Sequence, residues 1–378
     1  MKSILMFVAL MLPVPAAWAA QSLVTINDPP GDDYGAGTLF YPRRADFQTG
    51  DLDLLQMKIS RDEGGFWFEA IFKNPIRDPG NAANADGIES LANFARKGFY
   101  QFNIDVYIDT DRVNGSGNIF TLPGRQVRID PAYAWEKAVI LTPRPELMRE
   151  QLLDALTEQF PDRPRLEIEA SVDRSIFFAS RIRLRGKSIT FFVPSSFIAG
   201  SDGTDWGVTA LVTGALTSIP ADLSLFPSAK TPLDRLQLGV MQPAAGRPRD
   251  TFGYSGAAPS PVVDMLGSLT EQQVRQLAAK NKLAGVSWGP HAVNDAAVAS
   301  DATTAAPNPA ASIIATPAES IESLFQPADK PNETVHPGAP HTDSSIARRL
   351  QTLQQLFDQK LIDEAEYKQQ KQRILKEL

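Results

Sequence analysis

The sequence contains no cysteine, and this absence excludes several kinds of chemistry at once. Disulfide bonds, thiolate nucleophiles, zinc sites built on sulfur and a lipid-anchored N-terminus all need cysteine. Histidine is also scarce, because its three copies, His291, His336 and His341, all lie in the last quarter of the chain. We therefore expect a folded part with essentially no histidine, which excludes Ser-His and Cys-His catalytic pairs there.

Long apolar runs are missing too, apart from a short one at the N-terminus. Residues 4–12 (ILMFVALML) follow Lys2 and precede the stretch AAWAA, a pattern typical of a signal peptide cleaved after Ala19 or Ala20. The run is well short of the ~20 residues that a membrane-spanning helix needs. We predict a signal peptide over 1–20 and a periplasmic or secreted protein without a membrane span. The net charge of −7 argues against nucleic acid and anionic membranes as partners.

Short strand patterns dominate the sequence between about residues 50 and 240. The expected strands are 52–60, 66–73, 101–109, 136–142, 166–173, 176–184, 188–193, 206–213 and 236–240, with turn residues between them. Helical patterns cover 86–96, 144–158 and 268–282, and the last begins with a capping-box spacing from Ser268 to Glu271. This pattern predicts a mainly β protein, an antiparallel β-sandwich of the Ig-like or carbohydrate-binding-module type with short helical insertions.

The composition changes after the predicted sandwich, which we place at 21–290. Residues 291–343 are rich in Ala, Pro, Thr and Ser and poor in large apolar residues, as in a disordered linker. Residues 344–378 have two helical apolar patterns separated by a turn at Lys360-Leu361-Ile362. Two helices of this size cannot form a stable core alone, so we expect them to dock on a protein partner, a second copy or the main domain.

Aspartates are concentrated near the predicted start of the mature protein and in one later strand. Turns rich in Asp and Gly direct carboxylates outward, and alternate residues of a strand share one face. These patterns predict a Ca²⁺ site of six to eight oxygen ligands. The candidate ligands are Asp28, Asp32, Asp33, Asp51, Asp53, Asp105, Asp109 and Asp111. The alternative is that these side chains cap their own turns or pair with arginines such as Arg112 and Arg125.

Aromatic residues supply the candidate sugar-binding surface, because their flat faces stack on pyranose rings while carboxylates accept hydroxyl hydrogens. Tyr34 and Tyr41 lie in the Gly-rich acidic loop, and Trp135 follows a loop entry. We predict these three as ligand-binding residues, with core packing as the alternative. Trp67 and Trp206 lie between apolar neighbours in strand patterns, so we expect both in the core.

Two blocks, DPPGDDYG at Asp28–Gly35 and DVYIDTD at Asp105–Asp111, carry a family resemblance. Further motifs are Gly37, Tyr41-Pro42, Phe47, Asp51–Leu54 and Phe72–Pro75, with weaker ones at 123–125, 134–136, 193–196 and 260–264. Over about 22–280 the chain resembles the C-terminal binding module of glucodextranase, a β-sandwich similar to SLH and carbohydrate-binding modules. Residues 346–378 resemble a SHOCT helical hairpin. These resemblances imply polysaccharide or cell-envelope glycan binding, and oligomerisation or partner docking through 344–378.

The sequence therefore favours a non-catalytic exported protein that binds envelope or extracellular polysaccharide with the assistance of Ca²⁺. In glucodextranase-type enzymes the module follows a catalytic domain, whereas here we expect it to follow the signal peptide directly. Two alternatives remain open. One is a structural envelope scaffold with structural calcium, which burial of Tyr34, Tyr41 and Trp135 would favour. The other is a polysaccharide hydrolase, for which the sequence singles out no pair of acids.

Overall fold

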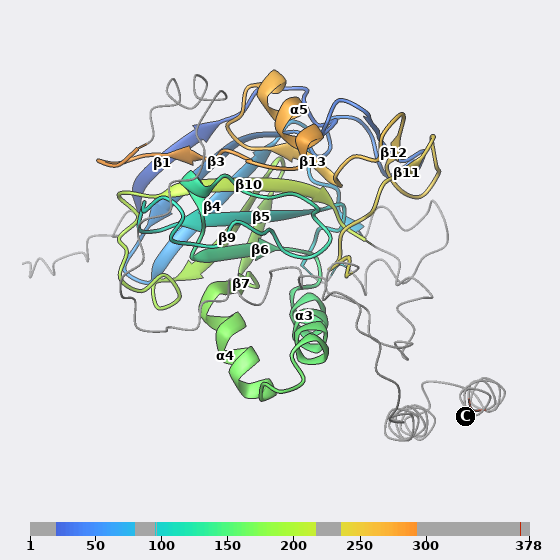
Figure 1. The fold of residues 1–378 in the computed structure, drawn as a ribbon. Coiled ribbons are helices and arrows are strands. Elements are labelled where there is room, and N and C mark those ends of the chain that lie inside the picture. Colours follow the sequence, from blue (N-terminus) through green and yellow to red (C-terminus); the bar gives the residue numbers. More distant parts are fainter. Residues whose placement is uncertain (1–19, 80–94, 96, 217–235, 293–370, 372–378) are drawn as a thin grey trace, which may run out of the picture. The chain divides into compact units, whose positions relative to one another are not determined.

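The computed structural model describes residues 20–79, 95, 97–216, 236–292 and 371 (Figure 1). Two sheets dominate the described part. One has five antiparallel strands in the order β1-β3-β4-β9-β8. Its strands are β1 (Gln21–Asn27), β3 (Leu54–Arg61), β4 (Gly65–Phe72), β9 (Ser188–Pro194) and β8 (Ile182–Arg185). The predicted hairpins at Gly64-Gly65 and around Gly186 are confirmed, because β3 pairs with β4 and β8 with β9.

The second sheet has the order β13-β10-β5-β6-β7, and β14 also pairs with β10. Its strands are β5 (Phe102–Asp109), β6 (Lys137–Leu141), β7 (Ile176–Phe178), β10 (Gly207–Gly214), β13 (Val262–Met265) and β14 (Val286–Ser287). All pairs are antiparallel except β6 with β7. A small third sheet joins β2 (Leu39–Phe40), β11 (Ala244–Ala245) and β12 (Gly253–Tyr254).

The two large sheets enclose the main hydrophobic core. Alternate residues of β4 and β9, such as Phe66, Phe68 and Phe191, point into it and meet Ile104 and Val106 of β5. Because facing sheets bury one face of every strand, this arrangement confirms the predicted mainly β sandwich.

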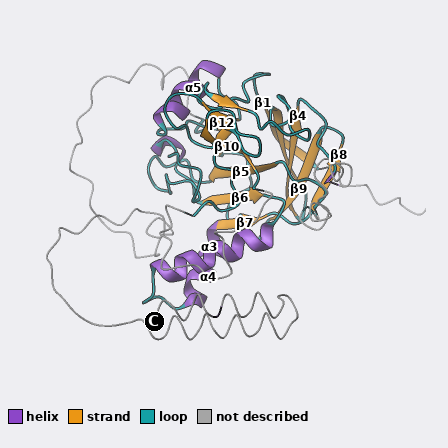
Figure 2. Ribbon diagram, turned by 90° about the vertical axis from the view of Figure 1, so that its right-hand side faces the viewer, coloured by secondary structure: helices purple, strands orange, loops and turns teal. Residues whose placement is uncertain are grey.

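A second core covers the other face of the sheet that contains β5. It is built by α3 (Pro145–Gln159), α4 (Arg165–Ser175), α5 (Thr270–Ala279), the short helix η1 (Pro131–Tyr133) and the loops near them. Helices α3 and α4 lie beside β7, whereas α5 lies near β13 at the other edge of the same sheet (Figures 1 and 2). Every residue of β5 and β10 is consequently buried, since both faces of these strands are covered.

Several sequence-based expectations about elements are wrong. Residues 166–173, predicted as a strand, belong to helix α4, because Ile168 and Val172 are spaced one helical turn apart and both enter the second core. The predicted strand 176–184 divides between β7 and β8, which belong to different sheets. The predicted strand 236–240 forms only an isolated bridge from Val240 to Ala215.

Other predictions lie outside the described residues. These are the signal peptide, nearly all of the predicted helix 86–96, the linker beyond Ala292 and, except for Lys371, the C-terminal hairpin. Within the described part, no helix has the length and apolar character that crossing a bilayer requires.

Candidate functional site

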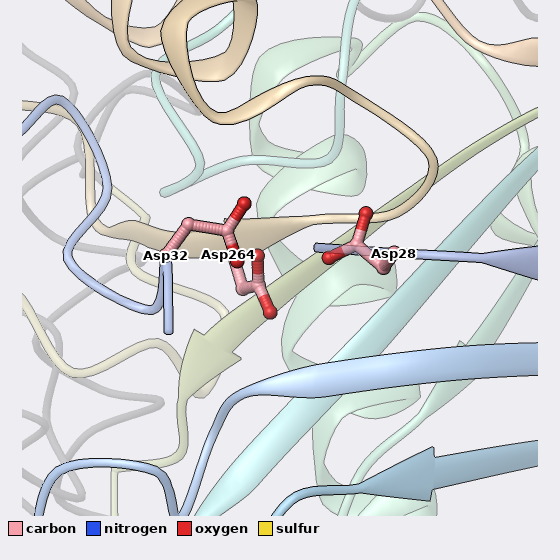
Figure 3. Close-up of side chains that lie close together, drawn as sticks. All are labelled: Asp28, Asp32 and Asp264. Carbon is pink, nitrogen blue, oxygen red and sulfur yellow. The ribbon is translucent and has the colours of Figure 1, made fainter. Parts of the chain in front are cut away.

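Three aspartates from distant parts of the sequence meet at one end of the sandwich (Figure 3). Asp28 directly follows β1, Asp32 lies in the turn after it, and Asp264 lies in β13. One carboxylate oxygen from each lies within 4.8 Å of the others, and all three residues are buried, with at most 8% of any residue exposed. Two of the three were predicted as metal ligands, whereas Asp264 was not.

Glycines in the acidic loop hold it against β13. Gly31, at a φ of +87°, donates from its backbone N–H to Asp53 Oδ2 at 2.7 Å. Gly35, at a φ of +58°, donates to the carbonyl of Val263 at 2.8 Å. A Cβ at Gly35 would lie 2.5 Å from the Val262 carbonyl oxygen, so only glycine fits there without displacing the strand.

The hydrogen bonds of the cluster leave some of its buried oxygens without a partner. Each oxygen of Asp264 accepts one backbone hydrogen bond, since Leu54 N–H donates to Oδ2 at 2.7 Å and Met265 N–H to Oδ1 at 2.8 Å, and each keeps a second lone pair for an ion. Asp28 Oδ1 accepts from Gly267 N–H, but Asp28 Oδ2 is buried without a hydrogen-bond partner. Asp32 Oδ1 and Asp53 Oδ1 are in the same state. Buried oxygens of this kind are costly unless a cation or water satisfies them.

The predicted capping box at the start of α5 does not form, and Thr270 at this position contacts the acidic loop. Its hydroxyl donates to Asp32 Oδ2 at 3.2 Å, and the helix begins at Thr270 after Leu269, which gives no side-chain cap. The amide of Gln273, one turn later, donates to the Asp32 carbonyl at 2.6 Å. The first turn of α5 therefore donates two hydrogen bonds that hold the acidic loop at Asp32.

Burial and mutual repulsion raise the pKa values of the three carboxyls. Burial, followed by the charge of Asp32, raises the pKa of Asp28 to about 8. Burial raises the pKa of Asp32 to about 6. The pKa of Asp264 is raised well above its ordinary value by burial and then by Asp28 and Asp32. Three carboxylates this close ionise together only when a positive charge lies among them.

The remaining acids of the N-terminal set have protein partners. Asp51 accepts hydrogen bonds from Gln48, Asn74, Arg77 and Gln101 at 2.9–3.1 Å and is not one of the three clustered aspartates, so its role as a metal ligand stays a prediction. Asp33 accepts from the Tyr41 hydroxyl and from Gly50 N–H. Asp53 adjoins the cluster, and its Oδ2 forms an ion pair with Lys73 at 2.8 Å while its Oδ1 stays unpartnered.

The acids predicted on the later strand do not join the first cluster. Asp105 pairs with Arg125 and Asp109 with Arg112, the ion pairs that the alternative interpretation expects, and Asp105 is not one of the three clustered aspartates. Asp109 and Asp111 form a second acidic group with Glu136, again within 4.8 Å. Burial, followed by the charges of Asp111 and Asp109, raises the pKa of Glu136 to about 7, although the Thr110 N–H opposes the shift.

The predicted aromatic platform is not formed. Trp135 is only 1% exposed, packs on Tyr107 and donates from Nε1 to the Phe120 carbonyl at 3.0 Å. Tyr41 is half-buried against Phe252, and its hydroxyl holds Asp33 and Leu52. Tyr34 is half-buried in the acidic loop. The core prediction is correct for Trp206 but wrong for Trp67, which is half-exposed on the outer face of β4.

Residues 23–286 match the family described as the C-terminal binding module, SLH-like, of glucodextranase. The chain belongs to this family. The match confirms the resemblance drawn from the DPPGDDYG and DVYIDTD blocks. Asp28, Asp32 and Asp264 all lie within the matched residues. A search of curated proteins finds no match. The SHOCT resemblance of 346–378 stays a prediction.

Proposed function

We propose that the chain is an exported, non-catalytic protein that binds envelope or extracellular polysaccharide, and that Ca²⁺ at Asp28, Asp32 and Asp264 stabilises its binding module. The observation that supports this proposal is the buried carboxylate cluster with unpartnered oxygens inside a module of a binding family. An extracytoplasmic location agrees with the predicted signal peptide and with a family named after a glucodextranase binding module.

Calcium suits the chemistry of the cluster better than other common ions. Ca²⁺ takes six to eight oxygen ligands in flexible geometry, whereas Zn²⁺ favours nitrogen and sulfur. The cluster offers carboxylate oxygens of Asp28 and Asp32 that lack partners, with Asp53 Oδ1 beside them. An ion there would neutralise carboxylates whose charges repel one another. It would also join the loop after β1 to β13 and to the start of α5, which fixes one end of the sandwich.

The direct test measures binding of the full chain to soluble polysaccharides. Neutral and acidic polymers are cast into native gels, and the migration of the protein is measured once in the presence of calcium and once in the presence of EDTA. We expect retardation by at least one polymer and weaker retardation in EDTA. No retardation by any polymer in either condition contradicts glycan binding. Calcium-dependent stability without glycan binding would instead favour the structural scaffold, which the burial of Trp135 also supports.

One observation favours a polysaccharide hydrolase as the second candidate. Glu136, whose pKa is raised to about 7, lies beside exposed Asp111, and Asp111 lines a polar cavity of about 580 Å³. A protonated acid near an ionised one is the arrangement that glycosidases use. The Glu136 carboxylate, however, already accepts hydrogen bonds from the Thr110 N–H and hydroxyl, at 2.7 and 3.1 Å. Release of reducing ends from α-glucans, absent in Glu136→Gln, would establish hydrolysis.

A further inference from the structure

A row of positive charges runs along the outer edge of the five-stranded sheet. Arg181 precedes edge strand β8, Arg183 and Arg185 lie within it, and all three are exposed. Alternate residues of a strand point to the same side and lie ~6.6 Å apart. Lys187, in the turn to β9, extends the row. The three arginine side chains therefore start from regularly spaced backbone positions on the same side of the sheet.

Two half-buried aromatic rings lie next to this row. The register places Trp67 of β4 opposite Phe192 of β9, and the Phe192 N–H donates to the Arg181 carbonyl. The two ring centroids are 4.8 Å apart. The Arg181 guanidinium lies 4.7 Å from both centroids, and that of Arg183 lies 5.1 Å from Trp67. Stacked guanidiniums of this kind keep their N–H edges free for a planar anion.

The nearby acids are already engaged. Asp62 accepts from Trp67 Nε1 at 2.7 Å and from the N–H groups of Gly64 and Gly65, although Arg181 also lowers its pKa. Glu69 faces Lys58 at 3.9 Å. Within the described part of the chain, Arg181, Arg183, Arg185 and Lys187 form no ion pair closer than 4.0 Å.

Protection of an open sheet edge is the ordinary explanation for charges on an edge strand. That role needs only charge at the edge, and lysine serves it well. It does not account for guanidiniums that lie over two half-buried aromatic rings, Phe192 on the neighbouring strand β9 and Trp67 on the strand after that, β4. This second feature adds an apolar surface and orients the donors, which is what recognition of a sugar carrying a carboxylate needs.

We propose that this face, defined by Arg181, Arg183, Arg185, Trp67 and Phe192, binds an acidic polysaccharide with repeating carboxylates, such as a polyuronate. The inference rests on the proposed glycan-binding function and names its ligand class and surface. The guanidiniums hold successive carboxylates, and the rings contact the apolar side of a sugar. Each sugar of such a polymer carries one carboxylate, which a guanidinium can hold through two parallel N–H bonds, whereas duplex DNA carries a phosphate charge every ~1.7 Å and no carboxylate.

The test compares two triple variants of the full chain. R181Q/R183Q/R185Q removes the row. The control R128Q/K280Q/K282Q removes the same charge from a second basic group, in which Arg128 and Lys282 are exposed, Lys280 is half-buried and Arg128 lies over the Phe120 ring. The probes are polygalacturonate, neutral dextran and duplex DNA, with calcium present. We expect the row variant and Trp67→Ala to weaken polygalacturonate binding at least about tenfold and the control to bind as the native chain does. The row variant should keep its melting temperature, whereas Trp67→Ala loses the Asp62 hydrogen bond and the packing on Phe192 and should melt lower.

The outcomes separate this inference from the proposed function. Equal polygalacturonate affinity in the row variant and the control overturns the inference. Binding of dextran alone, equal in all variants, also overturns it while leaving glycan binding intact. DNA binding as tight as polygalacturonate binding and lost in the row variant overturns it as well, because the face would then be a general polyanion surface. Failure to bind any glycan contradicts the proposed function itself.

Discussion

Asp105 and Arg125 form a bidentate ion pair inside the second core. Arg125 Nε and Nη2 donate to the two Asp105 oxygens at 2.5 and 2.9 Å, and neither side chain is more than 1% exposed. Arg125 also donates to the carbonyls of Pro123 and Leu238 at 2.9 and 3.0 Å. This one guanidinium therefore connects β5 to two loops. It supplies the positive charge beside Asp105 that the sequence analysis expected from Ca²⁺.

The first prediction concerns this pair. Asp105→Asn leaves Arg125 buried without a counter-charge, so we expect it to lower the free energy of unfolding by about 3–5 kcal/mol. Urea denaturation in calcium and in EDTA measures the loss. The loss should be the same in both conditions, because Asp105 is not part of the acidic cluster. A variant that no longer responds to calcium would instead place Asp105 in the ion site.

The second prediction concerns the acidic cluster with and without the ion. Calcium should raise the melting temperature of the full chain, with a stabilisation of about 2.7 kcal/mol at a concentration 100 times the dissociation constant. Asp28→Asn and Asp264→Asn should abolish that response. In EDTA, Asp28→Asn should melt no lower than the native chain, because the folded variant no longer has to keep a proton on a buried carboxyl that the unfolded chain releases.

Asp51→Asn is the matched control for the cluster variants, since Asp51 is buried but pairs with Arg77 and lies outside the cluster. It should destabilise the chain and still respond to calcium. If the melting temperature of the native chain is the same in calcium as in EDTA, as we expect for Asp28→Asn, the cluster binds no calcium and that part of the proposal is wrong.

The third prediction is a pH dependence of the ion-free chain. Asp28 and Asp32, with pKa values raised to about 8 and about 6, keep protons in the folded state that the unfolded chain releases near pH 3.8. The folded state then binds more protons, so the free energy of unfolding falls as pH rises through this window. In EDTA the native chain should therefore melt at a lower temperature at about pH 8 than at about pH 5.

Calcium should restore most of the stability that the ion-free chain loses at the higher pH. Asp28→Asn should show a smaller fall in EDTA, because it lacks the carboxyl whose pKa is raised to about 8. A native chain whose stability in EDTA rises between these two pH values would show that the carboxyls are ionised without an ion, which contradicts the cluster's electrostatics.

Local patterns predicted the parts of the fold that depend on neighbouring residues. The β3–β4 and β8–β9 hairpins followed from glycine turns between strand patterns. Helix α4 was missed because LEIEASVD alternates like a strand, and only the distant surface of the second core selects its helical spacing. Local sequence also could not fix which face of β4 is buried, so Trp67 was assigned to the core.

The site was predicted only in part for a similar reason. Asp28 and Asp32 stand out in a short acidic loop, whereas Asp264 lies in the apolar run PVVDML, more than 200 residues away. A single Asp within an apolar strand was the available signal, because a buried carboxylate needs a partner. Nothing in the local sequence, however, indicates that its neighbours come from the loop after β1.

The last prediction distinguishes the buried tryptophan from the half-exposed one. Trp135→Phe leaves the Phe120 carbonyl without its donor and reduces packing on Tyr107, so we expect a loss of about 1–3 kcal/mol in the free energy of unfolding. Its affinity for polygalacturonate should not change, since Trp135 is 1% exposed. Chemical denaturation and native-gel retardation of the same sample measure both quantities. If Trp135→Phe keeps its stability but loses glycan binding, Trp135 belongs to the binding surface and this prediction is wrong.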